Sequence, residues 1–288
     1  MLAKTATLRH SERARRSRTG SLIGWGLAGA CFAALAVAMA WIIGVVVWRG
    51  IGAIRLSLFT TVTEGRGGGL LNAIEGTAVL SGGGLLLAVP IGIATGAYIA
   101  NNAHTLLART TRFMSDVLAG MPSIVLGYCG YVTMVQGLGW HFSVAAGAIV
   151  LALISLPYIC RSTELALAQV PNELREAAYA LGAGEARVLF RMTLPAALPG
   201  TLTGILLALA ISVGETAPLL YTAGWSNYLW NGQLTHAPIG YLTYAIWTFI
   251  NEPFAAANAL AYAAAFLVTV FVLLITIASR LSLMRKQE

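Results

Sequence analysis

The acidic and hydroxyl side chains with the clearest potential for chemistry lie inside long apolar stretches of the sequence. Glu75 and Thr77 form one such pair, and Glu215 and Thr216 form another. A charge at the centre of a bilayer costs roughly 2.5–3.5 kcal/mol, so a carboxylate there requires a function or a partner. Each acid could line a substrate path or join two helices by hydrogen bonds. Each threonine could donate to a passing oxyanion or bond its own helix.

Further charged residues lie at the edges of apolar stretches. Arg161 is either the last cation of an anion path or an anchor whose long side chain reaches the membrane surface. Asp116 follows Arg112 by one helical turn, which predicts an ion pair between them, with Arg109 as the alternative partner. These groups indicate ion transport and helix contacts rather than covalent chemistry.

Motifs of catalysis are missing from the sequence. A loop that cradles nucleotide phosphates needs Gly-x4-Gly-Lys-Ser/Thr. Of the two lysines, Lys4 has too few residues before it, and Lys286 is followed by Gln287. The four His residues show no metal-ligand spacing, and there is no Gly-x-Ser-x-Gly segment. We therefore expect a protein that is not an enzyme and binds no metal or cofactor of its own.

The composition requires a membrane environment. The chain has 288 residues, of which 58% are hydrophobic and 10% charged, and its mean hydropathy is +0.76. Soluble domains carry about 25% charged residues, and a membrane-spanning helix needs about 20 apolar residues. Six segments have the required length: 21–48, 70–100, 112–135, 142–160, 196–223 and 255–281. The sequence predicts an all-α polytopic membrane protein with six transmembrane helices.

The basic residues predict how these helices are oriented. With a cytoplasmic N-terminus, only three of the 18 Lys and Arg residues fall outside. Because basic residues are retained on the cytoplasmic side, we expect both termini to be cytoplasmic. The basic tail 1–20 could bind nucleic acid or anionic membrane lipid, but its place directly before the first helix, 21–48, favours an orientation signal that holds the N-terminus in the cytoplasm. An extracytoplasmic loop, 49–69, and a core, 70–285, complete the predicted organisation.

Aromatic residues and paired glycines each have two possible roles in this sequence. The loop 224–254 is rich in aromatic side chains, which favour the water–lipid boundary. We expect a short interfacial or re-entrant helix over 238–250, and a docking surface for an extracytoplasmic partner is the other interpretation. Two GxxxG pairs allow close helix contact, either inside this chain or at a seam with another subunit. They are Gly92 with Gly96 and Gly200 with Gly204.

A charged stretch, 170–200, separates the fourth and fifth predicted spans. Its start, 171–173 (Pro-Asn-Glu), is typical of a helix N-terminus with Asn172 as the capping residue. An apolar stripe follows at helical spacing and ends at Gly182. A second short helix is expected over 185–192. The loop 161–195 is therefore predicted to form a helix–turn–helix on the cytoplasmic membrane surface.

The spacing within this stretch resembles the EAA motif of the membrane subunits of bacterial ABC importers. Glu176-Ala177-Ala178 is followed by Gly182, and then by Met192 and Leu194-Pro195, at that family's intervals. The resemblance covers roughly residues 70–285. It implies a type I ABC importer (MetI-like) permease fold, with a cytoplasmic coupling helix between spans four and five that enters a groove on an ATPase. The residues that it assigns to ATPase coupling are Glu173, Glu176, Ala177, Ala178, Gly182, Met192, Leu194 and Pro195.

Other segments are similar to one branch of this family, the PstA-like permeases of bacterial phosphate importers. These segments are 214–220 (GETAPLL), 71–77, 122–125 and 161–164. The resemblance implies import of inorganic phosphate by a multi-pass subunit of the cytoplasmic (inner) membrane. The candidate residues for a substrate path are Arg161, Glu215, Thr216, Thr77 and Glu75.

The resemblance also implies partners and leaves the cargo open. The partners are an ATPase homodimer that holds ATP and magnesium, a second homologous (PstC-like) permease and an extracytoplasmic phosphate-binding protein, with no nucleic acid. The chain departs from the family pattern at Ile211, where Arg is common, and at Glu75, where an apolar residue is usual. These departures keep sulfate, molybdate and phosphonate open as alternative substrates. An autonomous secondary transporter is a further alternative, although the sequence has no internal repeat.

Overall fold

The computed structural model describes residues 2–65 and 67–284, and the chain divides into two compact units, Met1–Arg49 and Gly50–Glu288. In its described part the first unit is helical and belongs to α1 (Leu2–Ala53), which continues into the second unit. The apolar section of α1, Gly24–Ala53, is long enough to cross a membrane. The first predicted span is therefore present, and the same helix includes the basic segment before it.

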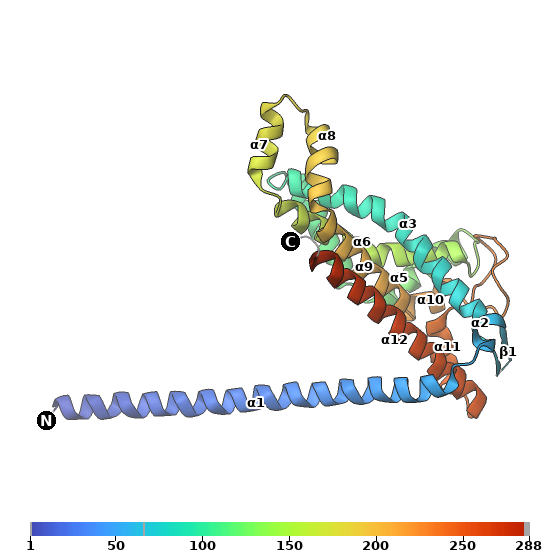
Figure 1. Cartoon of the computed structure of the whole chain (residues 1–288), viewed down its shortest axis with the longest axis horizontal. Coiled ribbons are helices and arrows are strands. Elements are labelled where there is room, and N and C mark those ends of the chain that lie inside the picture. The colour runs from blue at the N-terminus through green and yellow to red at the C-terminus, as the bar shows by residue number, and fades with distance from the viewer. Residues whose placement is uncertain (1, 66, 285–288) are drawn as a thin grey trace. The chain divides into compact units, whose positions relative to one another are not determined.

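The second unit consists of helices arranged around α6, with one small hairpin of strands (Figure 1). Its elements are α2 (Ser57–Thr60), β1 (Thr63–Glu64), β2 (Gly67–Gly68), α3 (Leu71–Asn101), α4 (Leu106–Gly120), α5 (Ser123–Gly130), the π-helix η1 (Tyr131–Gly137), α6 (Val144–Ala168), α7 (Asn172–Ala180), α8 (Glu185–Val188), the π-helix η2 (Leu189–Thr193), α9 (Leu194–Gly214), α10 (Ala217–Thr222), α11 (Leu242–Phe249) and α12 (Ala255–Met284). The strands pair antiparallel. At one end of the unit α7 and α8 project beyond the other helices, and α2, the strands and α11 lie at the opposite end (Figure 1).

Five helices of the described chain are long and apolar enough to cross a membrane, and they correspond to five of the six predicted spans. The third predicted span, 112–135, is not one continuous helix, although the two helices there are together long and apolar enough for a span. There the chain forms α4 and a second helix, Ser123–Gly137, bent by 98° relative to each other. Pro122 explains the bend, because the residue before a proline is disfavoured in helical conformation. Met121 has an extended backbone with ψ of 134°.

The fifth predicted span differs from the structure at its start. One continuous helix runs over Glu185–Gly214 through α8, η2 and α9. The prediction of a separate short helix over 185–192 is therefore wrong. A proline ring clashes with the carbonyl four residues earlier in an α-helix. The wider turns of η2 lie where Pro195 would meet that carbonyl, so the helix continues through the proline.

The fifth predicted span also ends earlier than 223. The helix stops at Gly214, Glu215 has extended backbone, and α10 begins at Ala217. Pro218 lies four residues after Gly214 and has no amide hydrogen for the Gly214 carbonyl. The chain therefore breaks in the middle of a long apolar segment, at the residues that carry the predicted transport chemistry.

Glycines of α3 and α9 bring both helices close to α6. A Cβ on Gly92 would lie 2.8 Å from an α6 side chain, and a Cβ on Gly200 would lie 2.7 Å from another. Gly96 and Gly204 approach α6 in the same way. Both GxxxG pairs therefore pack helices of this chain together, which was one of the two alternatives.

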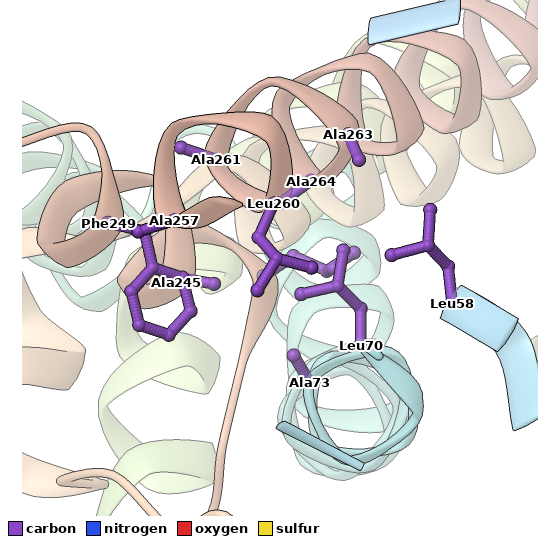
Figure 2. Packing of buried hydrophobic residues seen from close by; sticks show 11 residues of the cluster. Leu58, Leu70, Ala73, Ala245, Phe249, Ala257, Leu260, Ala261, Ala263 and Ala264 are labelled. Atoms are coloured by element: carbon purple, nitrogen blue, oxygen red, sulfur yellow. The ribbon is translucent and has the colours of Figure 1, made fainter. Parts of the chain in front are cut away.

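An apolar cluster joins α3, α11 and α12 at the end of the unit opposite α7. Figure 2 shows side chains of these helices, including Ala73, Phe249 and Leu260, meeting in the cluster. Burying one such side chain contributes about 1.5–3 kcal/mol. The helix predicted over 238–250 is present, but it begins at Leu242. This cluster holds α11 against the bundle.

Gly76 of α3 marks the place where the chain before α11 crosses that helix. A Cβ on Gly76 would overlap the carbonyl oxygen of Gly240. Because the obstacle is backbone, Gly76→Ala is expected to lower the free energy of unfolding by about 1–3 kcal/mol. Thermal unfolding of the purified protein in detergent measures the change. Gly82→Ala is the control, since a Cβ on Gly82 of the same helix meets open space. Equal midpoints for the two variants would contradict the close approach.

Candidate functional site

The helix predicted within the charged stretch is present as α7. Pro171 is its N-cap residue and Asn172 its first helical residue, and no side-chain cap hydrogen bond forms, so the predicted capping role of Asn172 is wrong. At the other end Gly182 has a left-handed backbone with φ of 77°. The amides of Gly182 and Ala183 donate to the carbonyls of Tyr179 and Ala178. This Schellman arrangement ends α7 and explains the glycine in the motif.

The motif residues of α7 lie on two faces of the helix. Glu173, Glu176 and Ala177 are exposed. Ala178 is 2% exposed, and Leu174 packs in an apolar cluster that includes residues of α3, α6 and α9. The exposed face therefore presents two carboxylates beside a small side chain, and the opposite face attaches α7 to the bundle.

The remaining motif residues lie on the continuous helix that follows the Gly182 turn. Met192 belongs to η2, and Leu194 and Pro195 begin α9. Met192 and Leu194 are half-buried, whereas Pro195 is exposed. The motif thus joins an exposed helix face to the start of a membrane-spanning helix through one tight turn.

Arg161 belongs to an ion cluster between α4 and α6. Oε1 of Glu164 accepts from Nε and Nη2 of Arg112 at 3.1 and 2.7 Å, and Oε2 accepts from Nη1 of Arg161 at 3.0 Å. The predicted pair of Asp116 with Arg112 is therefore wrong. Asp116 is exposed and can remain hydrated, whereas the nearly buried Glu164 carboxylate needs a cation.

Glu75 and Thr77 hold the chain segment that precedes α11. The Glu75 carboxylate accepts from the Trp230 amide at 3.1 Å. The Thr77 hydroxyl accepts from the Leu242 amide at 2.9 Å and donates to the Ala73 carbonyl at 2.8 Å. Leu242 is the first residue of α11, so Thr77 satisfies an amide that the helix itself leaves without an acceptor. Both side chains therefore accept hydrogen bonds from backbone amides, and their place in a substrate path stays a prediction.

Glu215 lies in the break between α9 and α10. Its backbone carbonyl accepts from the Thr243 hydroxyl at 2.7 Å. Glu215 lines two cavities, one of about 10 Å³ and one of about 200 Å³. The larger cavity lies at the bend between α4 and α5, where Ser123 and Tyr158 also line it. Thr216 follows as the N-cap residue of α10, without a side-chain cap hydrogen bond.

The smaller cavity has the volume of about one water molecule, and both polar and apolar residues line it. Thr77, Glu215 and Tyr241 line it, whereas Glu75, Arg161 and Thr216 do not. Tyr241 is 1% exposed, and its hydroxyl has no hydrogen-bond partner among the described residues. Burial, with a smaller contribution from Tyr244, raises the pKa of the Tyr241 phenol above its ordinary value. Tyr241 therefore remains a neutral group that can donate a hydrogen bond into the cavity.

Sequence reasoning missed the contacts of three residues that lie inside the quoted motifs. Glu164 is three residues after Arg161, a visible helical spacing, but its stronger partner Arg112 is far away in the sequence. Asn72 gave no sequence signal of its bonds to Thr63 of β1 and to the distant Ser226. Arg175 directly precedes Glu176, but its guanidinium bonds the Leu167 carbonyl of α6, whereas Glu176 is exposed.

The overall fold is similar to that of membrane subunits of solved ABC importers. The MetNI methionine ABC transporter, in an inward-facing conformation, has a TM-score of 0.58 and 22% identity over 74% of this chain and 92% of that chain. A bacterial alginate ABC transporter, in complex with an alginate-bound periplasmic protein, has a TM-score of 0.58 and 16% identity over 86% and 91%. The fold is that of a MetI-like ABC importer permease, a membrane subunit with several spans.

Sequence similarity places the chain more closely. Residues 88–285 match the family described as binding-protein-dependent transport system inner membrane component, and the chain belongs to this family. The phosphate transport system permease protein PstA 2 of Mycobacterium bovis is 46% identical over 93% of this chain and 89% of that protein. The corresponding PstA of Yersinia pestis is 43% identical over 86% and 84%.

Proposed function

We propose that this chain is a permease subunit of an ATP-driven importer and moves inorganic phosphate across the cytoplasmic membrane. The observation that carries the proposal is the exposed face of α7, where Glu173 and Glu176 stand beside a Schellman turn in the EAA motif. An exposed acidic helix face at the end of a membrane bundle fits a groove on a separate ATPase. Similarity to PstA proteins over most of the chain supports phosphate as the cargo.

The orientation and the partners follow from the same proposal. The distribution of basic residues supports an orientation with α7 and both termini in the cytoplasm and the segment before α11 on the outer side. The chain has no cofactor of its own, and an ATPase homodimer supplies ATP and magnesium. A second homologous (PstC-like) permease completes the path, and an extracytoplasmic phosphate-binding protein delivers the cargo.

Ile211 is relevant to which oxyanion is transported, because related permeases commonly carry an arginine at this position. Ile211 is half-buried against the apolar cluster of α5, η1 and α6, so this position contributes no cation to an anion path. Uptake of radiolabelled phosphate, sulfate, molybdate and phosphonate by the reconstituted importer decides between these cargoes. Phosphate uptake that the other oxyanions do not compete with is the expected result, and preferred uptake of another oxyanion would contradict phosphate.

Coupling through α7 is tested by two substitutions with a matched control. Glu176→Lys reverses a charge on the exposed face and is expected to reduce phosphate uptake and phosphate-stimulated ATP hydrolysis at least about tenfold. Gly182→Ala forces a side chain into left-handed backbone, which costs roughly 1–2 kcal/mol and displaces the turn. Both reactions are measured on the reconstituted complex.

Gly184→Ala is the control for the turn. Gly184 lies two residues from Gly182, is exposed and has φ of −75°, a value that alanine adopts freely. This variant should retain both uptake and stimulated hydrolysis. Normal coupling in Glu176→Lys and Gly182→Ala together would refute the assignment of α7 to the ATPase contact.

A further inference from the structure

Arg175 connects α7 to the ends of two other helices. Its Nη2 donates to the carbonyl oxygen of Leu167 in α6 at 3.0 Å, and its Nη1 donates to Oδ1 of Asn101 in α3 at 3.3 Å. The residue is half-buried, whereas its neighbour Glu176 is exposed. Adjacent residues of α7 thus face in different directions, one toward solvent and one toward the bundle.

The position of this guanidinium is favourable for a cation. Asn101 is the last residue of α3, and Leu167 lies in the last turn of α6. The C-terminal ends of helices carry partial negative charge and unpaired carbonyl groups. Hydrogen bonds from a charged donor are stronger than those between neutral groups. One side chain therefore binds the ends of two spans that pack against each other along α3 and α6.

The attachment of α7 to the spans is concentrated near this side chain. Leu174 and Ala178 pack beneath the helix, but a hollow of about 730 Å³ lies between α7, α8 and the last turns of α3. Tyr179 and Arg175 of α7, together with Asn101 and Tyr98 of α3, line this hollow. Because the hollow keeps much of α7 away from α3, a displacement of α7 is expected to reach α3 mainly through Arg175.

We propose that Arg175 is the positioning residue that transmits movement of α7 to α3 and α6. The inference deepens the proposed function and rests on it, because α7 must first be the element that the ATPase moves. Glu176 would contact the ATPase, and Arg175 would convert the displacement of α7 into movement of two spans. The buried Nε of Arg175 has no partner among the described residues. The guanidinium therefore has a further donor that could form a new hydrogen bond when α7 moves.

The test measures the number of phosphate ions imported per ATP hydrolysed by the reconstituted complex. Arg175→Ala is expected to retain the bound ATPase and its ATP hydrolysis but to lower this ratio about tenfold, the effect of losing charge-assisted hydrogen bonds. Arg175→Lys keeps a cation at the two helix ends and should restore part of the ratio. Arg109→Ala removes an exposed arginine of α4 and should leave the ratio unchanged.

The outcomes separate this inference from the proposed function. A normal import ratio in Arg175→Ala, or loss of the bound ATPase from that variant, would overturn the transmitting role. An Arg175→Lys variant as uncoupled as Arg175→Ala would also contradict it, since the cation would then contribute nothing. If Glu176→Lys and Gly182→Ala both keep normal ATPase binding and coupling, the proposed ATPase contact of α7 fails. If only Glu176→Lys uncouples transport, α7 remains the ATPase contact and Arg175 is not its link.

Discussion

Asn72→Ala is expected to lower the free energy of unfolding by about 3 kcal/mol, because it leaves buried backbone groups without partners. Oδ1 of Asn72 accepts from the Thr63 amide at 3.0 Å, and Nδ2 donates to the Ser226 carbonyl at 2.8 Å. Asn72 and Thr63 are each 1% exposed, so water cannot replace these bonds freely. The side chain joins the strand hairpin and the segment before α11 to the first turn of α3.

The measurement is the thermal midpoint of the purified protein in detergent, together with protease sensitivity of the segment 224–241. This segment should become easier to cleave in Asn72→Ala, since the variant removes the side chain that anchors it to α3. Asn251→Ala is the matched control. Asn251 is exposed, and within the described part of the chain its side chain bonds only the Trp247 carbonyl, so its loss should change stability by less than about 0.5 kcal/mol. Equal midpoint shifts in the two variants would show that Asn72 is not the anchor.

Glu164→Ala should destabilise the protein by about 3 kcal/mol, at the low end for breaking a buried ion pair. The low end applies because the Arg112 and Arg161 side chains are 33% and 53% exposed and can regain water, whereas the Glu164 side chain is 10% exposed. Loss of the carboxylate leaves Arg112 and Arg161 to repel each other at the contact between α4 and α6. The effect should decrease at high salt, since mobile ions screen the remaining repulsion.

A double-mutant cycle isolates the contribution of the pair. Arg112→Ala combined with Glu164→Ala should cost less than the sum of the single variants, with a coupling energy of about 1 kcal/mol or more. Asp116→Ala serves as the control, because Asp116 is an exposed acid on the same helix as Arg112. A large loss of stability in Asp116→Ala, with little in Glu164→Ala, would restore Asp116 as the partner of Arg112.

Prolines decided where the structure departs from the predicted spans. Hydropathy predicted one continuous span over 112–135 and another over 196–223. It sums the polarity of the side chains and takes no account of whether the backbone between them can remain helical. The helices are interrupted at Met121, directly before Pro122, and at Glu215, three residues before Pro218. Pro195 interrupts nothing, since the π-helical turns before it remove the clash. The presence of a proline was visible in the sequence, but its consequence depended on the local backbone and on the helices packed around it.

The sequence by itself determined the membrane class, most of the spans and the motif that identifies α7. These properties depend on residue type and local spacing, which the chain carries regardless of how it folds. Only the tertiary structure decided that Ala178 is buried while Glu176 is exposed, and that Glu164 rather than Asp116 binds Arg112. It also decided that Glu75 holds a distant loop amide. These outcomes depend on distances between groups that are far apart in the sequence, and such distances are set when the helices pack together.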